Sequence, residues 1–140
     1  MQAVELSPAD APAAVGLWEA CGLTRPWNDP VSDFTRALGG PSSTVLGLRA
    51  SGDGASLLGT VMVGGDGHRG WVYYLAVRPE LQGQGLGRVL MHAADDWLRE
   101  RDLPKIQLMV RRGNDGVVAF YERLGYAIQD VLVLGRRLDD

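Results

Sequence analysis

Lysine is almost absent from this chain of 140 residues, and the other basic residues are dispersed. Lys105 is the only lysine, and no basic cluster exceeds the pairs Arg111-Arg112 and Arg136-Arg137. The formal net charge is −3. Proteins that bind nucleic acids carry a basic patch or stripe, which this sequence does not contain. We therefore expect no nucleic-acid partner.

Cysteine is represented by Cys21 alone, which excludes a disulfide bond within the chain and favours a reducing compartment. Cys21 is read either as a catalytic thiol or as a small apolar residue beside Leu17 and Trp18 on the first helix. No apolar run approaches the roughly 20 residues of a membrane span. The N-terminus also lacks the basic start and apolar core of a signal peptide. These absences predict a cytoplasmic protein with no membrane partner.

Histidine is also rare, and its positions do not suggest a metal site. His68 and His92 lie far from each other and from Cys21, without the spacing of metal ligands. His68 is either a base or ligand, or a residue of the turn Asp66-Gly67-His68-Arg69-Gly70. We expect no metal cofactor.

The overall composition is that of a globular domain, with 46% hydrophobic and 22% charged residues. At this length we expect one domain, residues 1–140. In the first half, the sequence predicts a short strand at 4–6, a helix over 13–21, a helix after Asp29-Pro30, and strands at 44–49 and 57–63 joined by a turn at 51–54. In the second half, it predicts a strand at 71–77, a helix over 86–98 and an extended run at 105–111. A helix that begins after Asn114 or Asp115 and ends at Gly125, and final strands over 126–134, complete the chain.

The order of these elements predicts an α/β fold. Strand, helix, strand and helix follow one another in the second half, which favours parallel pairing with a right-handed crossover. The hairpins before them favour antiparallel pairing. We expect a mixed sheet covered by helices on both faces.

The most informative segment is Leu75 to Leu90, in which an apolar strand leads through a glycine-rich turn into an amphipathic helix. Gly83, Gly85 and Gly87 allow a tight turn and expose backbone N–H groups. The N-terminus of the following helix adds unpaired donors and the positive end of its dipole. Together these features predict an anion site for a phosphate or pyrophosphate, although a glycine-rich surface turn is the alternative.

Two familiar phosphate-binding patterns do not fit this loop. A Walker loop requires Lys and Ser or Thr after its last glycine, whereas Gly87 is followed by Arg88 and Val89. The dinucleotide pattern requires glycine where Arg88 stands. The arrangement Gln82-x-x-Gly85-x-Gly87 instead resembles the coenzyme A pyrophosphate loop of the GNAT superfamily of N-acetyltransferases.

A second segment resembles the same superfamily in the expected order. Asn114 and Tyr121 are seven positions apart and precede Leu-Gly-Tyr at 124–126, as in the second GNAT motif, with Val117 in place of the usual alanine. The resemblance covers the chain from about Leu57 onward. It implies the three-layer GNAT fold, a mixed, mostly antiparallel sheet with helices on both faces and a splayed central parallel strand pair.

The resemblance also implies an activity. An N-acetyltransferase of this kind moves the acetyl group of acetyl-CoA to a primary amine by direct attack in a ternary complex. The acceptor stays open between a small-molecule amine, an amino acid and a peptide N-terminus. We expect the protein to be a monomer or homodimer. The alternatives are a non-catalytic acyl-CoA-binding sensor, an acyltransferase that prefers a longer chain, and a structural protein without cofactor.

The same resemblance assigns roles to individual residues. The end of the strand at 71–77 would bind the pantetheine amides and the acetyl carbonyl, and the backbone amides of the glycine loop would hold the pyrophosphate. Asn114 would contact the pantetheine arm, and Tyr121 would point at the sulfur of coenzyme A. The implied cofactor-binding residues are Leu75, Ala76, Val77, Gln82, Gly83, Gln84, Gly85, Leu86, Gly87, Arg88, Asn114 and Tyr121.

Tyr121 is the predicted catalytic residue. With a phenol pKa of ~10 and a thiol pKa of ~8.5, complete proton transfer to the departing thiolate is uphill by about 2 kcal/mol. A hydrogen bond that strengthens as charge develops on sulfur requires no such transfer. The alternative role is that of a core tyrosine, because Val117, Val118 and Leu124 lie on the same helical face.

The acceptor amine must lose a proton, because an alkylamine with a pKa of ~10.4 is almost entirely protonated at neutral pH. Family members often place a glutamate, as this base, on the strand before the glycine loop, whereas the strand at 71–77 offers Tyr73 and Tyr74. Glu19, Asp29 and a chain of waters are further candidates for the base. The acceptor wall is expected near Trp18, Arg25 and Trp27.

Overall fold

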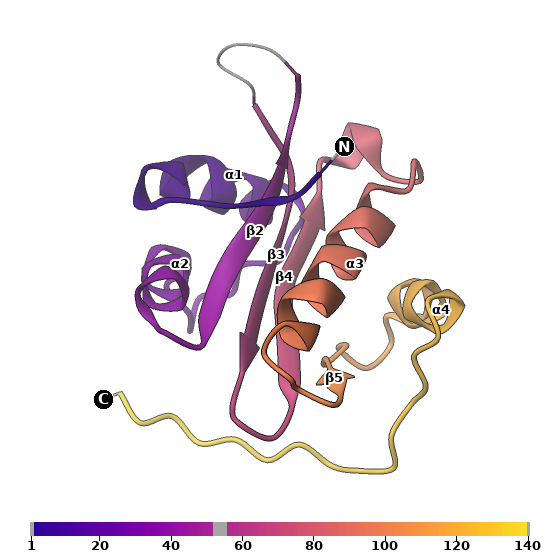
Figure 1. Ribbon diagram of the computed structural model, residues 1–140. Helices are drawn as coiled ribbons and strands as arrows, with labels where there is room; N and C mark the ends of the chain where they lie inside the picture. The colour runs from indigo at the N-terminus through magenta and orange to yellow at the C-terminus, as the bar shows by residue number, and fades with distance from the viewer. Residues whose placement is uncertain (1, 52–55, 140) are drawn as a thin grey trace. The chain divides into compact units, whose positions relative to one another are not determined.

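The computed structural model describes residues 2–51 and 56–139 (Figure 1). Contacts along the chain divide it into a first compact unit, Met1–Met109, and a second, Val110–Asp140. The first unit contains the sheet and three of the helices discussed below. The turn expected at 51–54 lies, apart from Ser51, outside the residues that the structure describes.

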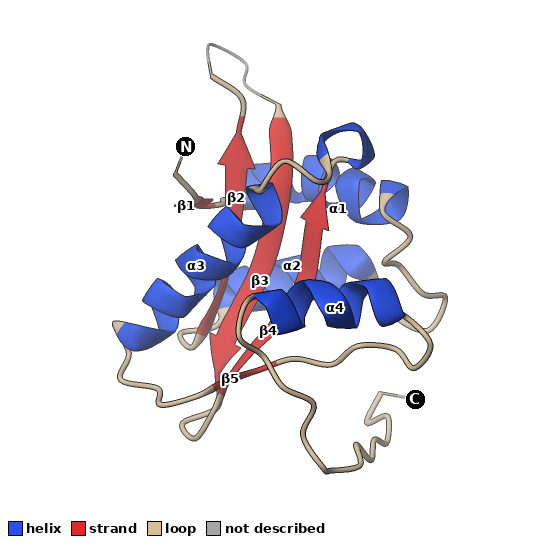
Figure 2. Ribbon diagram, turned by 90° about the vertical axis from the view of Figure 1, so that its right-hand side faces the viewer, coloured by secondary structure: helices blue, strands red, loops and turns tan. Residues whose placement is uncertain are grey.

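A mixed five-stranded sheet forms the centre of the first unit, in the order β1-β2-β3-β4-β5 (Figure 2). The first four strands pair with one another in antiparallel fashion, and β5 pairs with β4 in parallel. This arrangement confirms the predicted mixed, mostly antiparallel sheet. The strands are β1 (Val4–Glu5), β2 (Ser43–Arg49), β3 (Leu57–Gly65), β4 (Gly70–Val77) and β5 (Ile106–Gln107).

Helices cover both faces of this sheet, as expected from the order of elements. Two helices lie against one face and a third against the other (Figures 1 and 2). The first face carries α1 (Ala11–Ala20), preceded by a 3-10 turn at Pro8–Asp10, and α2 (Pro30–Gly39), whereas the second carries α3 (Leu86–Arg99).

The ends of α1 and α2 follow from local chemistry. The carboxylate of Asp29 accepts hydrogen bonds from the backbone N–H groups of Val31 (3.1 Å) and Ser32 (3.4 Å), and Pro30 occupies the first helical position. Helix α1 is followed by Gly22 with φ +70, a conformation that favours glycine. Both ends lie where the sequence predicts them.

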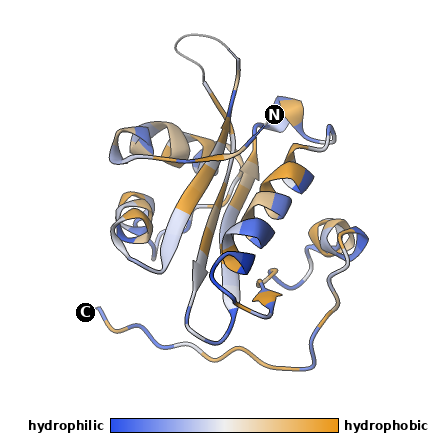
Figure 3. Ribbon diagram, viewed as in Figure 1, coloured by the Kyte–Doolittle hydropathy of each residue, from blue (hydrophilic) through white to orange (hydrophobic). Residues whose placement is uncertain are grey.

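The core on the α1 and α2 side is built around two large aromatic side chains. Trp18 and Phe34 are fully buried, with ring centroids 6.0 Å apart, and Val45 of β2 packs in the same cluster. On the other face, α3 carries apolar and hydrophilic segments in alternation (Figure 3). Its buried side chains are Leu90, Met91, Ala94, Trp97 and Leu98.

Gly59 of β3 lets α3 and β4 approach closely. A Cβ atom at this position would lie 2.8 Å from the carbonyl oxygen of Ala76 and 2.9 Å from Cδ1 of Leu90. We predict that Gly59→Ala lowers the free energy of unfolding by about 1–3 kcal/mol, because the backbone of β4 must shift. Urea denaturation measures the change, and a variant as stable as wild type would contradict the prediction.

Gly16→Ala is the matched control for this substitution. A Cβ atom at Gly16, in helix α1, would meet nothing within 4 Å. Alanine is also the better helix former, so the control is expected to raise stability by about 0.5–1 kcal/mol.

The second unit contains helix α4 (Asp115–Arg123). The prediction of final strands over 126–134 is wrong, because the structure assigns no strand to residues 124–139. The extended run predicted at 105–111 is a strand at Ile106–Gln107 and not beyond. An apolar segment alone does not make a strand, since each strand needs a neighbour for its backbone hydrogen bonds. None of the helices described has the length and apolarity required to cross a lipid bilayer.

Candidate active site

Strand β4 loses its parallel neighbour after its first residues. The ladder joins Gly70 to Ile106 and Trp71 to Gln107, whereas β4 continues to Val77. Over residues 72–77, in the part of the chain that the structure describes, this edge has no partner strand. The predicted splayed parallel pair is therefore present, but it lies at the edge of the described sheet and not at its centre, because residues 124–139 add no strand beyond β5. The open edge of β4 is a place where an extended ligand can bind by main-chain hydrogen bonds.

The other edge of β4 contains an irregularity at Tyr74. The β3–β4 register passes from Thr60 opposite Ala76 to Met62 opposite Tyr73, so two residues of β4 face Val61. Tyr74 has φ +52, the left-handed conformation, which costs an L residue roughly 1–2 kcal/mol. Strain of this kind in a strand beside an open edge marks a functional candidate.

The glycine loop connects β4 to α3 in the way its sequence suggests. A short 3-10 helix (Pro79–Leu81) follows β4, and the side-chain amide of Gln82 then donates to the carbonyl oxygen of Val77 at 3.1 Å. Gly83 and Gly85 have φ +82 and +87, so both positions require glycine. Helix α3 begins immediately afterwards, with Gly85 at its N-cap.

The backbone donors of this loop are available to a ligand. Among the residues described, the N–H groups of residues 83–88 donate to no protein acceptor, and the helical pattern resumes with Val89 bonded to Gly85 at 3.2 Å. Residues 82–85 and Arg88 are exposed. Six donors at the positive end of a fourteen-residue helix form a favourable environment for a pyrophosphate.

Asn114 and Tyr121 lie on α4 in the second unit. Asn114 is exposed at the N-cap, and its side chain makes no capping hydrogen bond. Tyr121 is 8% exposed, and its ring meets those of Phe120 and Tyr126 edge-on, at centroid distances of 5.0 and 5.4 Å. Burial raises the pKa of Tyr121 to about 12, so the phenol keeps its proton over the whole neutral range.

A model of the acetyltransferase (GNAT) family matches residues 8–126. The chain belongs to this family. It is therefore an acyltransferase of class EC 2.3.1, and the family to which it belongs uses acetyl-CoA.

Solved structures with the same fold include several acetyltransferases. A putative acetyltransferase from Agrobacterium tumefaciens superposes with a TM-score of 0.78 at 18% identity, covering 98% of this chain and 100% of its own. AAC(6')-Iy, in complex with the bisubstrate analogue CoA-S-monomethyl-acetylneamine, gives 0.79 at 13% identity, with 97% of both chains covered. The ribosomal-protein-S18-alanine N-acetyltransferase from Escherichia coli gives 0.72 at 25% identity, covering 89% of this chain and 76% of its own.

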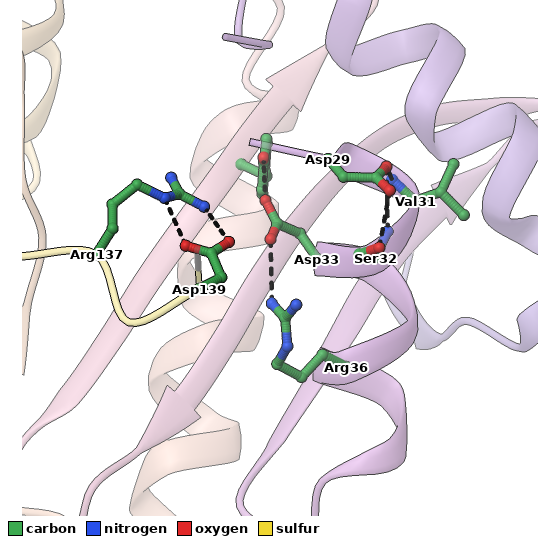
Figure 4. A network of polar contacts seen from close by, with 8 residues as sticks. Asp29, Val31, Ser32, Asp33, Arg36, Arg137 and Asp139 are labelled. Atoms are coloured by element: carbon green, nitrogen blue, oxygen red, sulfur yellow. Dashed lines mark hydrogen bonds and ion pairs between the residues drawn. The ribbon is translucent and has the colours of Figure 1, made fainter. Parts of the chain in front are cut away.

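Two of the residues predicted as the general base of this acetyltransferase, Asp29 and Tyr73, are poorly suited to accept a proton. The carboxylate of Asp29 caps α2 and also accepts from the hydroxyl of Ser32 at 2.8 Å (Figure 4). The Ser32 hydrogen bonds hold the pKa of Asp29 below its ordinary value, which makes it a weaker base. Burial raises the pKa of Tyr73, so its phenol is protonated at neutral pH and takes up no further proton. Glu19 is exposed on α1.

The surroundings of Trp18, Cys21 and His68 favour a structural role for each of these residues over a role in catalysis or acceptor binding. Trp18 is fully buried and therefore does not line an acceptor site. The thiol of Cys21 donates to the carbonyl oxygen of Val77 at 3.2 Å, and burial raises its pKa, which disfavours the nucleophilic thiolate. The backbone N–H of His68 donates to Asp66 in the β3–β4 turn, which is the position that the turn alternative for His68 predicts.

Within the ranges that the structure describes, no three His, Cys, Asp or Glu side chains lie together in a way that could hold a metal ion.

Sequence reasoning missed two polar residues that contact Tyr74. The phenol of Tyr74 donates to Asp33 of α2 at 2.7 Å, and the other oxygen of Asp33 binds Arg36 at 3.2 Å (Figure 4). The hydroxyl of Thr60 donates to the carbonyl oxygen of Tyr74 at 3.0 Å. Asp33 and Thr60 belong to no motif, so no sequence signal pointed to these contacts.

The raised pKa of Tyr121 predicts a loss of stability in strong base. Below pH 10 the phenol is neutral in both folded and unfolded chains, whereas above pH 10 the unfolded chain ionises first. The free energy of unfolding should therefore fall between pH 10 and about 12, with about 3 kcal/mol of the fall due to Tyr121. Urea denaturation of wild type and Tyr121→Phe at several pH values measures this contribution, and parallel curves for the two proteins would contradict it.

Proposed function

We propose that this protein transfers the acetyl group of acetyl-CoA to a primary amine, by direct attack of the amine on the thioester in a ternary complex. The N–H groups of residues 83–88, which donate to no acceptor among the described residues, carry this proposal, because they offer several donors to a dianionic pyrophosphate at one helix end. The proposed contacts come from the backbone of Gly83, Gln84, Gly85, Leu86, Gly87 and Arg88, whereas the N–H of Gln82 already donates to the carbonyl oxygen of Pro79 at 3.5 Å.

The acyl end of the donor is assigned to the open edge of β4. Leu75, Ala76 and the N–H of Val77 are proposed to bind the pantetheine amides and the acetyl carbonyl by main-chain hydrogen bonds, as an added strand would. The carbonyl oxygen of Val77 already accepts hydrogen bonds from Gln82 and Cys21. Asn114 is proposed to contact the pantetheine arm. Its exposed side chain, free of the capping role, supports this assignment.

Tyr121 is proposed to donate a hydrogen bond to the leaving sulfur. With its pKa raised to about 12, complete proton transfer to a thiolate of pKa ~8.5 would be uphill by about 5 kcal/mol. A strengthening hydrogen bond avoids this barrier. For the proton of the amine, we propose Glu19 or a chain of waters, since Asp29 is engaged in capping and Tyr73 is protonated.

The remaining expectations accompany this proposal. A family match over residues 8–126 and structural relatives matched along nearly their whole length support a single acetyltransferase domain over 1–140. The cytoplasmic location, and a monomer or homodimer as the assembly, stay predictions.

The test is the release of free thiol from acetyl-CoA in the presence of different amines. A peptide with N-terminal alanine and an aminoglycoside represent the acceptors in the names of two structural relatives, and free amino acids form a third arm. Acetyl-, propionyl- and succinyl-CoA are compared as donors, and binding of CoA is measured separately by calorimetry.

The outcomes separate the alternatives. Amine-dependent thiol release that is fastest with acetyl-CoA supports the proposal, and faster release with a longer chain would replace acetyl by that acyl group. Binding of acetyl-CoA without thiol release across the panel would instead indicate a sensor. Absence of CoA binding would overturn the proposal.

A further inference from the structure

A chain of buried polar contacts lies behind the irregularity of β4, on the side covered by α1 and α2. The indole N–H of Trp18 donates to the hydroxyl of Thr60 at 2.9 Å, and this hydroxyl donates to the carbonyl oxygen of Tyr74 at 3.0 Å. Trp18 and Thr60 are both fully buried. The N–H of Trp18 therefore orients the Thr60 hydroxyl, and this hydroxyl holds the Tyr74 carbonyl toward Thr60.

The side chain of Tyr74 is held from the same direction. Its ring stacks on that of Trp18, with centroids 3.8 Å apart and planes 10° from parallel, and its phenol donates to Asp33 at 2.7 Å. These contacts hold both the side chain and the carbonyl of a residue whose φ of +52 is strained for tyrosine.

The planarity of the peptide bond carries this constraint to the next residue. In a trans peptide the C=O of one residue and the N–H of the next point in opposite directions. The C=O of Tyr74 points at Thr60. The N–H of Leu75 therefore points away from Thr60 and β3, and the β3–β4 register skips Leu75.

We propose that Thr60 is a positioning residue for acetyl transfer, which acts through the Tyr74 carbonyl to aim the N–H of Leu75 at the carbonyl oxygen of the bound thioester. This inference rests on the proposed function. Trp18 orients the Thr60 hydroxyl, and Asp33 holds the ring of Tyr74. As the amine attacks, negative charge develops on the thioester oxygen, and a donor that is already aimed stabilises that charge without reorganisation.

Thr60→Val tests the role with little change in shape. Valine keeps the volume of threonine and removes the hydroxyl, so the Tyr74 carbonyl loses its partner. We expect kcat to fall roughly tenfold, because a small misplacement of a catalytic donor has a large effect on rate. The Kd for CoA, which has no acetyl group, should stay at the wild-type value.

Thr60→Ser and Thr44→Val are the controls. Serine retains the hydroxyl and should restore most of kcat. Thr44 is also a buried threonine, on neighbouring β2, but it lies opposite Val63 and not beside Tyr74. Its substitution by valine should leave kcat unchanged.

Asp33→Ala is a second variant for the case that Thr60→Val folds poorly. It changes a residue at the partly exposed start of α2 and should also lower kcat, because Asp33 holds the ring of Tyr74.

A readout that needs no turnover completes the experiment. In wild type, acetyl-CoA should shift the backbone amide resonance of Leu75 further than CoA does, and Thr60→Val should remove this difference. Equal kcat and an equal Leu75 shift in wild type and Thr60→Val would overturn the positioning role and leave the proposed function standing. Failure of wild type to bind CoA would overturn the proposed function, and the positioning role with it.

Discussion

Tyr121→Phe is expected to lower kcat roughly a hundredfold while changing the Kd for acetyl-CoA by less than about threefold. The hydroxyl is proposed to bind the sulfur most strongly when charge develops on it, so its removal affects the transition state more than the bound substrate. Rapid-mixing kinetics and calorimetry measure the two quantities independently.

The position of Tyr121 makes this substitution informative. The side chain is 8% exposed, and its contacts with Phe120 and Tyr126 are ring contacts, which phenylalanine retains. A large loss of kcat that Tyr126→Phe does not share would therefore reflect the hydroxyl and not the packing of α4. Because its pKa is raised to about 12, Tyr121 should add no ionisation step to the pH profile of kcat below pH 10.

Tyr126→Phe is the control for Tyr121→Phe. It removes the same group from a ring that contacts Tyr121 at 5.4 Å, and we assign no catalytic role to it. Its kcat should stay near that of wild type. Wild-type turnover by Tyr121→Phe would refute the catalytic assignment, and equal losses in the two variants would attribute the effect to packing.

Gly85→Ala is expected to weaken the binding of CoA roughly tenfold to thirtyfold. Gly85 has φ +87 at the N-cap of α3, so a side chain there must rotate the backbone that directs the loop amides. Binding of pantetheine, which lacks the pyrophosphate, should change little. Calorimetry with both ligands measures the difference.

Gly67→Ala separates this loss of binding from simple strain. Gly67 also has φ +87, and a Cβ atom at either glycine would meet nothing within 4 Å. Both variants should lose roughly 1–2 kcal/mol of stability, but Gly67→Ala should bind CoA as wild type does. Equal CoA affinity in the two variants would contradict a pyrophosphate site at residues 82–88.

Much of the first unit could be predicted from local chemistry. Asp29-Pro30 predicted the start of α2, and the glycine loop predicted a turn into α3, because capping, proline geometry and positive φ act within a few residues. Final strands were predicted over 126–134, and the structure assigns no strand to these residues. Pairing with a neighbouring strand decides such elements, and composition does not contain that information.

The role of individual side chains was less accessible to prediction. Trp18 was expected near the acceptor and is buried in the core, stacked on Tyr74 from a distant strand. Asp33 and Thr60 carried no signal, since they lie 41 and 14 positions from Tyr74 in the chain.

By itself, the sequence determined the family, the two motifs and the glycine conformations of the loop, because these depend on residue identity over short distances. Only the tertiary structure decided which groups are still available for chemistry. Among the described residues, it left the loop amides 83–88 without protein acceptors, buried Trp18 in the core and aimed the Tyr74 carbonyl at Thr60. Each of these outcomes depends on hydrogen-bond partners and burial, which form only when distant parts of the chain pack together.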